Sequence, residues 1–407
     1  MRRLIVIGNP GNRRTEGIQQ ARAALGLAPA VIVPYLELLQ GRLTLAEAAD
    51  EAWGADSDDP PPLLRLDAPG EHFAVERELI ALGAPDRNAG RDSDRLLPFG
   101  HRPDPEPWMA KTALSLTEQN GRLYHPSQWF RGFGRLLARL EREAEEHWPH
   151  GRWLNAPGDI IGMFDKRRTH RVLKAAGVSV PRLLAEPDGL PDYEALRETM
   201  LRLRLHRVFV KLAAGSGACG VVAYQLNPVT GSEVAVTTVG VERFLSRPPV
   251  FYNAMKPRRY TERADIRTIV NWLLRHGAHV EQWMAKAAYG DRGFDIRQLV
   301  VAGEACHGVA RASRTPMTNL HLRSERLDVE ALALPPETVD AVRRSAVEAV
   351  AAFPASAVAG VDVIVARGTL RPYVIDVNPF GDLLYRVQHE GCDTYTWEMK
   401  RLGDCWP

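Results

Sequence analysis

The chain has 407 residues, of which 45% are hydrophobic and 25% charged, a usage typical of a folded globular protein rather than of a disordered or fibrous one. A chain of this length exceeds what one core normally serves, so we expect two or three packed domains. The formal net charge is only +2 and arginine is spread along the chain, which argues against a nucleic-acid partner.

Cysteine spacing and hydropathy exclude further classes of protein. The four cysteines are too widely spaced for a zinc cage and indicate no disulfide framework. The apolar run Leu4–Ile7 is too short for a signal peptide, and no stretch is long enough to cross a bilayer. We therefore expect a cytoplasmic protein with no membrane partner. A homodimer is compatible with the sequence, which leaves the oligomeric state open.

The amino-terminal elements predict a βαβ unit. A buried strand at Leu4–Gly8 precedes a Gly/Asn loop, a helical pattern through Ala21–Leu25 and a second strand at Val31–Val33. The loop lacks the GxGxxG spacing of a dinucleotide site, so it assigns no ligand. Apolar residues recur at helical spacing from Ser127 to Trp148. This region is expected to be an α/β domain whose own substrate the sequence does not identify.

The middle of the chain alternates helices with short strands. Asp165–Ala176, with Asp165 as N-cap, and Glu262–His276 are predicted helices. Val208–Leu212 and Val221–Tyr224 are predicted strands, separated by a glycine-rich loop. The other predicted elements are strands at Val280–Met284, Ile296–Val301, Gly308–Ala312, Val361–Val365 and Tyr373–Val377, and a helix at Pro336–Ala352.

The strongest chemical signal is a hairpin near the carboxyl end. Strand side chains alternate between faces, so Asp376 and Asn378 point the same way, and a turn centred near Thr369 sets Asp362 roughly opposite Asp376. Two carboxylates and an amide on otherwise apolar strands need a hard cation, and Mg²⁺ prefers such sparse carboxylates completed by phosphate and water. The alternative is that Asp376 and Asn378 merely cap the end of the strand.

A second hairpin carries arginines. Asp295 and Arg297 alternate on one strand, the chain turns at Ala302–Glu304, and Arg311 returns on the next strand, which places Arg297 and Arg311 close together. Two guanidinium groups side by side suit an oxyanion such as a phosphate or a carboxylate. The alternative is a structural ion pair between Asp295 and Arg311.

Two lysines lie upstream of these hairpins. Lys166 opens a predicted helix, and Lys211 ends a buried strand directly before the loop from Gly215 to Gly220. A lysine at the end of a buried strand needs an anion, and glycines let backbone N–H groups approach phosphate oxygens closely. The loop is not the GxxxxGK[ST] motif, so the P-loop architecture is excluded.

In chain order, the segments from Asn155 to Gly381 resemble the ATP-grasp superfamily. In order, they are a helix that opens with Asp-Lys, the segment aGvsvP and a strand that ends in lysine. A glycine loop, an acidic-aromatic linker, the motif DxR and a strand that carries an arginine follow. The motifs GxDvi and DvNP come last. The resemblance is to the carboxylate-amine/thiol ligase type, which includes glutathione synthetase and the ribosomal-protein glutamate ligases. It implies an α/β protein with an ATP-grasp fold, α+β in its ATP-binding lobes, after a Rossmann-like N-terminal domain. The implied domains are residues 1–125, a linker helix and central lobe at 126–280, and a C-terminal lobe with the metal site at 281–407.

The resemblance also implies roles for single residues. The lysines would contact ATP phosphates, the loop would close over them, and the 281–284 backbone would meet adenine. The ATP-binding residues implied are Lys166, Lys211, Gly215, Ser216, Gly217, Gly220, Glu281, Gln282, Trp283, Met284 and Asp295. The implied catalytic residues are Arg297 and Arg311, and the implied ligands of Mg²⁺, with Mn²⁺ as an alternative ion, are Asp362, Asp376 and Asn378.

The function expected from this resemblance is ATP-dependent ligation. A carboxylate from a small molecule or a peptide would be activated as an acyl phosphate and joined to an amine, with release of ADP and phosphate. Two residue patterns depart from the family. Asp376 stands where the family usually has glutamate, and its shorter side chain would shift the metal or turn a bidentate ligand into a monodentate one. Met317–His321 follows the family's loop only loosely, so the substrate-side assignments are weaker than the ATP-side ones. An ATP-grasp phosphotransferase, a non-catalytic ATP-binding protein and a structural α/β protein whose motif order is coincidental remain alternatives.

Overall fold

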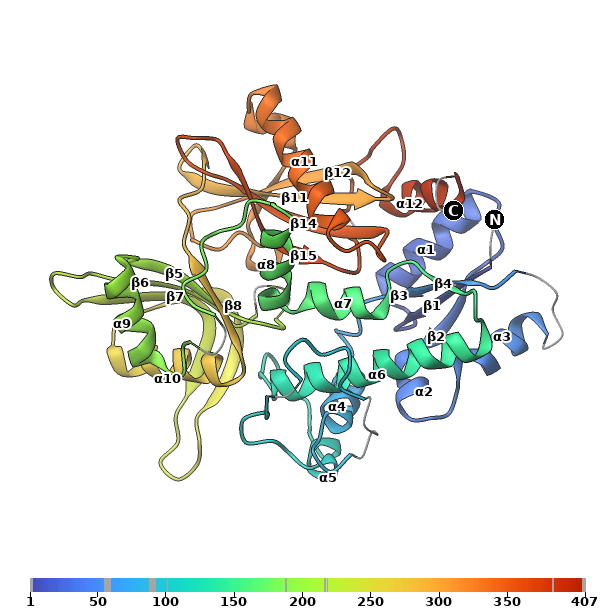
Figure 1. The fold of residues 1–407 in the computed structure, drawn as a ribbon, viewed down its shortest axis with the longest axis horizontal. Coiled ribbons are helices and arrows are strands. Elements are labelled where there is room, and N and C mark those ends of the chain that lie inside the picture. Colours follow the sequence, from blue (N-terminus) through green and yellow to red (C-terminus); the bar gives the residue numbers. More distant parts are fainter. Residues whose placement is uncertain are drawn as a thin grey trace.

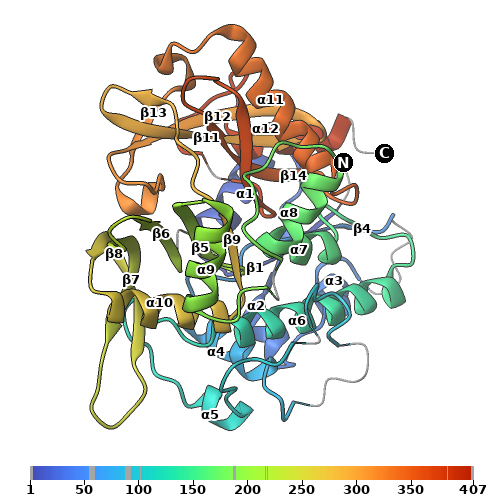
Figure 2. The same ribbon diagram turned by 60° about the vertical axis from the view of Figure 1, so that its left-hand side comes forward.

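The structure is a computed structural model that describes residues 3–54, 60–87, 93–100, 102–186, 189–215, 217, 219–382 and 384–404. Its described strands form three sheets, and the chain folds as three units around the centrally placed helix α8 (Figures 1 and 2). Within the described ranges, no helix combines the length and the apolar character needed to cross a membrane.

The first sheet has four parallel strands in the order β2-β1-β3-β4. The strands are β1 (Leu4–Gly8), β2 (Val31–Pro34), β3 (Leu63–Leu66) and β4 (Arg152–Trp153). The helices of this unit are α1 (Arg13–Ala24), α2 (Tyr35–Leu39), α3 (Leu45–Trp53), α4 (Phe73–Leu82), α5 (Ala110–Leu114) and α6 (Pro126–His147). The predicted βαβ opening is confirmed. The fourth strand comes from residues 152–153, which lie beyond the boundary expected at residue 125.

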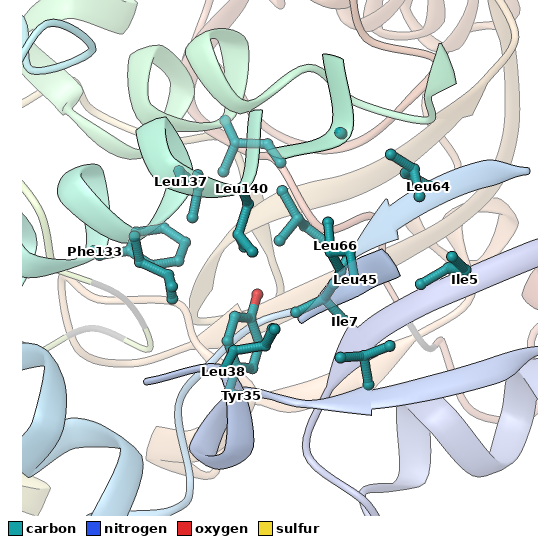
Figure 3. Close-up of a cluster of buried hydrophobic side chains, with 14 of the residues drawn as sticks. Ile5, Ile7, Tyr35, Leu38, Leu45, Leu64, Leu66, Phe133, Leu137 and Leu140 are labelled. Atoms are coloured by element: carbon teal, nitrogen blue, oxygen red, sulfur yellow. The ribbon is translucent and has the colours of Figure 1, made fainter. Parts of the chain in front are cut away.

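Alternation along β1 places its side chains in two different cores. Ile5 and Ile7 pack with residues of α2, α3, α4 and α6, as Figure 3 shows for Ile5, Ile7, Tyr35, Leu45 and Phe133 among others. Leu4 and Val6 face the opposite way, toward α1 and the carboxyl-terminal part of the chain. A continuous apolar run is what a parallel strand covered on both faces requires. This sheet is therefore the middle layer of its unit.

Helices α4 and α6 touch through their backbones at two glycines. A Cβ added to Gly132 would lie 1.8 Å from the carbonyl oxygen of Leu79, and one added to Gly83 would lie 1.9 Å from that of Gln128. No side chain can be accommodated at these distances without separating the helices.

Replacing Gly132 by alanine is expected to lower the free energy of unfolding by about 3 kcal/mol, because the methyl group forces α6 away from α4. Urea denaturation followed by circular dichroism measures the change. Gly158→Ala is the matched control, since a Cβ there meets only Leu96 at an ordinary 3.8 Å. Equal stability of the two variants would contradict the close packing of these helices.

The second sheet is antiparallel, with the order β8-β7-β6-β5-β9. The strands are β5 (Arg207–Leu212), β6 (Val221–Leu226), β7 (Glu233–Glu242), β8 (Val250–Tyr260) and β9 (Ala278–Gln282), and the helices packed on this sheet are α9 (Tyr193–Leu203) and α10 (Arg263–Arg275). Strands β7 and β8 and helix α9 were not predicted. The basic run Lys256–Arg259 lies in β8, an edge strand, where Pro257 is tolerated.

The third sheet is also antiparallel, with the order β13-β12-β11-β14-β15, and β10 pairs with β11. The strands are β10 (Ala288–Tyr289), β11 (Arg292–Val301), β12 (Glu304–Ser313), β13 (Glu325–Leu327), β14 (Val358–Val365) and β15 (Pro372–Asn378). The remaining helices of the C-terminal part are α11 (Pro336–Ala351), α12 (Thr394–Asp404) and the short 3-10 turns Leu320–Leu322 and Val329–Leu332. Helix α11 packs on this sheet, whereas α12 packs against α1 of the first unit.

Helices α7 (Pro157–Phe164) and α8 (Lys166–Ala175) link the three units. The carboxylate of Asp165 accepts the backbone N–H of Arg167 and so caps α8, as predicted. The backbone N–H of Lys166 donates to Ala213 O at 2.9 Å, which ties the start of α8 to the end of β5. The first residue of α8 is therefore fixed at the carboxyl end of β5, an inner strand of the second sheet.

Candidate active site

An open cavity of about 820 Å³ lies between the second and third sheets. Of the residues predicted to form a site, those that line the cavity are Lys166, Lys211, Gly215, Gly217, Glu281, Gln282, Met284, Asp295, Arg297, Arg311, Asp362, Asp376 and Asn378. Segments more than 200 positions apart in sequence thus meet in one place.

Two predicted ligand-binding residues, Gly220 and Trp283, do not line this cavity. A third, Ser216, lies outside the described residues. Gly220 packs against the side chain of Leu212, since a Cβ at this position would be 2.4 Å from Leu212 Cδ1. The ring of Trp283 lies 5.5 Å from that of Phe209, tilted by 52°, and the backbone N–H of Trp283 donates to Arg207 O at 3.1 Å. The indole therefore covers the flank of β5, and the adenine contact expected of the backbone of residues 281–284 stays a prediction.

The acidic residues of the carboxyl-terminal hairpin lie on adjacent strands. Asp362 on β14 is the cross-strand partner of Asp376 on β15, and Arg297 on β11 is the partner of Asp362 on its other side. These three side chains form a row across the sheet on the face that lines the cavity. A β-bulge follows, because Val363 pairs with Val374 rather than with residue 375. Without this extra residue, the partner of Asp362 would be Ile375.

Asn378 completes the oxygen set two residues along the same strand. Its Nδ2 donates to the backbone oxygen of Gly360 at 3.0 Å, so Oδ1 is the atom left for a ligand. Two carboxylates and an amide oxygen fit a hard divalent cation such as Mg²⁺. Among the described residues, no group of three or more His, Cys, Asp or Glu is arranged for a metal, as expected of a set with only two acids.

Basic side chains neutralise both carboxylates. Asp376 accepts from Lys166 Nζ at 3.0 and 3.1 Å. Asp362 accepts from Arg297, with Nη2 to Oδ2 at 3.1 Å, and from Arg311 Nη2 at 2.9 Å. Burial alone would raise the pKa of Asp362, but the charges of Arg297 and Arg311 outweigh it and hold that pKa well below its usual range. Asp362 therefore stays ionised, as a metal ligand must.

Both sequence interpretations of the arginine hairpin describe real contacts. Arg311 donates to Asp295 through Nε at 2.8 Å and Nη2 at 2.9 Å, which is the structural ion pair. Arg297 and Arg311 also share Asp362, so the two guanidinium groups do lie together. Asp295 and Asp362 thereby hold both cations in fixed positions on the wall of the cavity.

The two predicted lysines enter the cavity from different elements. Lys166 Nζ also donates to Gly215 O at 3.0 Å, which links α8, the glycine loop and β15. Lys211 lies next to Phe209 on the cavity side of β5, while Val208 and Val210 face the core. Its ammonium pairs with Glu281 on β9 and lies 3.5 Å from Ile375 O. Both ammonium groups therefore face the metal-side hairpin, the pair β14 and β15 that carries Asp362, Asp376 and Asn378.

Glu281 has a side-chain position that the sequence did not reveal. Its carboxylate binds both Lys211 and His279, the latter at 2.9 Å from Nε2. Burial raises the pKa of Glu281, but Lys211 and His279 outweigh it and lower that pKa to about 2. The prediction assigned residue 281 to an adenine contact through its backbone, whereas its side chain holds Lys211 in place.

Further polar residues near the site were missed in the sequence. Asp382 binds Arg297 Nη1 at 2.5 Å, and Lys286 and Thr318 line the cavity beside Asp295. No strand pattern surrounds these residues, so only the tertiary fold reveals them. The rest of the wall is mostly apolar, which suits a nucleobase. Its apolar members are Pro181, Phe209, Val221, Met284, Pro316, Met317, Ile364 and Ile375.

Solved structures resemble this chain over almost its full length. D-cycloserine synthetase DcsG is 13% identical, with 98% of this chain and 99% of that chain covered and a TM-score of 0.51. Macrocyclase MdnC from Microcystis aeruginosa MRC, solved with its precursor peptide MdnA, is 11% identical, with 98% and 99% covered and a TM-score of 0.50. The ATP-grasp ligase PsnB, solved with a phosphomimetic minimal precursor, Mg and ADP, is 14% identical, with 100% and 99% covered and a TM-score of 0.49.

Sequence comparison adds no closer relative. No protein-family model matches the chain, and no curated protein matches it significantly. At 11–13% identity the structural likeness bears on the fold and not on the substrate. DcsG and MdnC are both ATP-grasp ligases, and their folds align with nearly all of this chain. The chain therefore has an ATP-grasp fold.

Proposed function

We propose that this chain is an ATP-dependent ligase that activates a carboxylate as an acyl phosphate and joins it to an amine. The observation that carries the proposal is the meeting of Lys166, Lys211, Arg297 and Arg311 with an oxygen-ligand set in one cavity that also has an apolar wall. An apolar pocket suits adenine, and convergent cations suit a polyphosphate.

The reaction divides into two steps in which the protein mainly positions charges. An oxygen of the substrate carboxylate attacks the γ-phosphorus of ATP, the bond to the β,γ-bridging oxygen breaks, and ADP leaves. The amine then attacks the acyl carbon and releases one proton to solvent, and phosphate departs with the bonding electron pair. Phosphoryl transfer asks little covalent chemistry of the protein, so positioning and charge neutralisation carry most of the catalysis.

Each cation has a place in this scheme. In this scheme, Lys166 and Lys211 would neutralise the phosphates of ATP. Arg297 and Arg311 would neutralise the transferred phosphoryl group and the acyl phosphate. Asp362, Asp376 and Asn378 would hold Mg²⁺, which when bound supplies further neutralisation of the phosphate oxygens. Because Asp376 is bound to Lys166 at 3.0 Å, nucleotide and metal would have to share or replace this contact.

The structural neighbours support ligation over simple phosphorylation. DcsG is named as a synthetase of a small molecule, D-cycloserine, and MdnC as a macrocyclase that binds a precursor peptide. By analogy, we expect a small-molecule or peptide carboxylate and an amine nucleophile for this chain. The analogy gives the class of the two substrates only.

The proposal is tested by measuring ADP release with MgATP and pairs of amino acids and peptides. Sustained release is expected only when a matching acid and amine are both supplied, and mass spectrometry should find the amide. The matched control is Asn378→Ala, in which release should fall. A phosphorylated acid that accumulates without an amide would indicate a phosphotransferase, and Mg²⁺-dependent ATP binding without any ADP release would indicate a non-catalytic ATP-binding protein.

A further inference from the structure

Lys286 is a cation of the cavity that no part of the sequence pattern singled out. It lies between β9 and β10, in the segment that joins the second sheet to the third. Its side chain is 12% exposed and lines the same cavity as Lys211 and Arg311. The three cations therefore approach one space from β5, from the linking segment and from β12.

The contacts of Lys286 leave its charge poorly compensated. Its Nζ donates to Thr318 Oγ1 at 2.5 Å, a neutral partner, and the nearest carboxylate oxygen in an ion pair is Asp295 Oδ2 at 3.8 Å. That carboxylate already accepts two bonds from Arg311 and one from Thr318. Within the described part of the chain, Lys286 thus uses one of its three N–H donors. The carboxylate nearest to it, Asp295, is bound mainly by Arg311.

The other cations of the cavity each have a carboxylate of their own or share one in direct contact. Lys166 is bound to Asp376, Lys211 to Glu281, and Arg297 to Asp362. A buried ammonium without such a partner is costly, and an incoming anion would relieve the cost. Burial lowers the pKa of Lys286, and the charges of Arg311 and Lys211 act in the same direction. Asp295 and Asp362 oppose this lowering without cancelling it.

We propose that Lys286 binds a phosphate oxygen of the nucleotide, as a third ammonium beside Lys166 and Lys211. This inference rests on the proposed function, because it takes the ligand of the cavity to be ATP. A polyphosphate chain carries enough anionic oxygens to serve Lys211, Lys286 and Arg311 together, whereas one carboxylate group does not. Thr318 keeps the Lys286 ammonium pointed into the cavity by accepting a hydrogen bond from it.

Binding affinities for a series of nucleotides test this role without any need for turnover. Adenosine, AMP, ADP and the β,γ-imido analogue of ATP are titrated with Mg²⁺ into the wild-type chain and into Lys286→Met by calorimetry. The affinity of Lys286→Met for adenosine should equal that of the wild type. For the first compound in the series that carries the contacted phosphate, and for each longer one, the affinity of the variant should be about 10- to 100-fold lower, as expected for one charged hydrogen bond. Lys286→Arg should recover part of the loss.

Two comparison variants make the outcome unambiguous. Lys174→Met removes an exposed lysine on α8 that does not line the cavity, and its affinities should match the wild type. Lys211→Met reports whether the phosphates are bound as proposed. If Lys211→Met loses phosphate-dependent affinity while Lys286→Met keeps it, or if Lys286→Met weakens adenosine equally, the role of Lys286 is wrong. If the wild type binds none of the four compounds, the proposed function itself fails and this role with it.

Discussion

Replacing Asp362 by asparagine is expected to lower the rate of ADP release by about 10²- to 10³-fold, the usual cost of removing one group that stabilises charge in the transition state. Asp362 has two duties that depend on its negative charge. It is an oxygen ligand of the proposed metal set, and it fixes Arg297 and Arg311 through direct contacts. Asparagine keeps the size of the side chain and removes the charge.

The metal assignment has a readout that is separate from turnover. For the wild type, Mg²⁺ together with ADP should raise the melting temperature more than ADP alone, since a ligand that binds the folded state stabilises it. Asp362→Asn and Asn378→Ala should both lose this additional rise. Asp376→Glu should retain it and keep activity within about 10-fold, because it preserves the carboxylate charge that binds Lys166.

Loss of a buried counter-ion also lowers stability, so unfolding is measured for the same variants. Arg297 still has Asp382 and Arg311 still has Asp295 when Asp362 is neutral, and we expect Asp362→Asn to remain folded. A folded Asp362→Asn or Asn378→Ala variant with wild-type Mg²⁺ dependence and wild-type ADP release would remove the metal site from this hairpin.

The metal-side hairpin could be predicted because the residues that indicate it lie close together in the sequence. Strand alternation places Asp376 and Asn378 on one face, and the short turn brings Asp362 opposite. The exact partner of Asp362, however, depends on the β-bulge at residue 375, and no residue pattern there signals an insertion. The prediction reached the right pair because the centre of the turn was set near Thr369, half a residue away from the centre of the pairs nearest the turn, Val363 with Val374 to Val365 with Pro372.

Other parts of the site depend on contacts that only the tertiary fold creates. The pairing of Lys211 with Glu281 joins strands that are 70 positions apart in sequence, and no residue pattern indicated that these strands are neighbours. Lys286 and Asp382 stand outside regular strands, so alternation cannot assign them a face. Strand β8 was missed because it is an edge strand whose polar run and Pro257 do not alternate with apolar residues.

Replacing Lys211 by methionine is expected to lower kcat/KM for ATP by about 10²- to 10³-fold, because one charged donor to the phosphates is lost. The same change leaves Glu281 buried, 3% exposed, with His279 as the one side-chain partner that remains among the described residues. Such an uncompensated charge destabilises the fold, on the order of 3 kcal/mol. A loss of activity in this variant could therefore come from either cause.

The double variant Lys211→Met with Glu281→Gln separates catalysis from stability. Removing both charges eliminates the unpaired carboxylate, so the free energy of unfolding in urea should return toward that of the wild type. Activity should stay as low as in Lys211→Met, because the ammonium that contacts ATP is still missing. Glu281→Gln alone should keep a larger part of the activity, since Lys211 Nζ remains in the cavity near Ile375 O at 3.5 Å. If the double variant recovered activity together with stability, Lys211 would be a structural partner of Glu281 and not a ligand of the nucleotide.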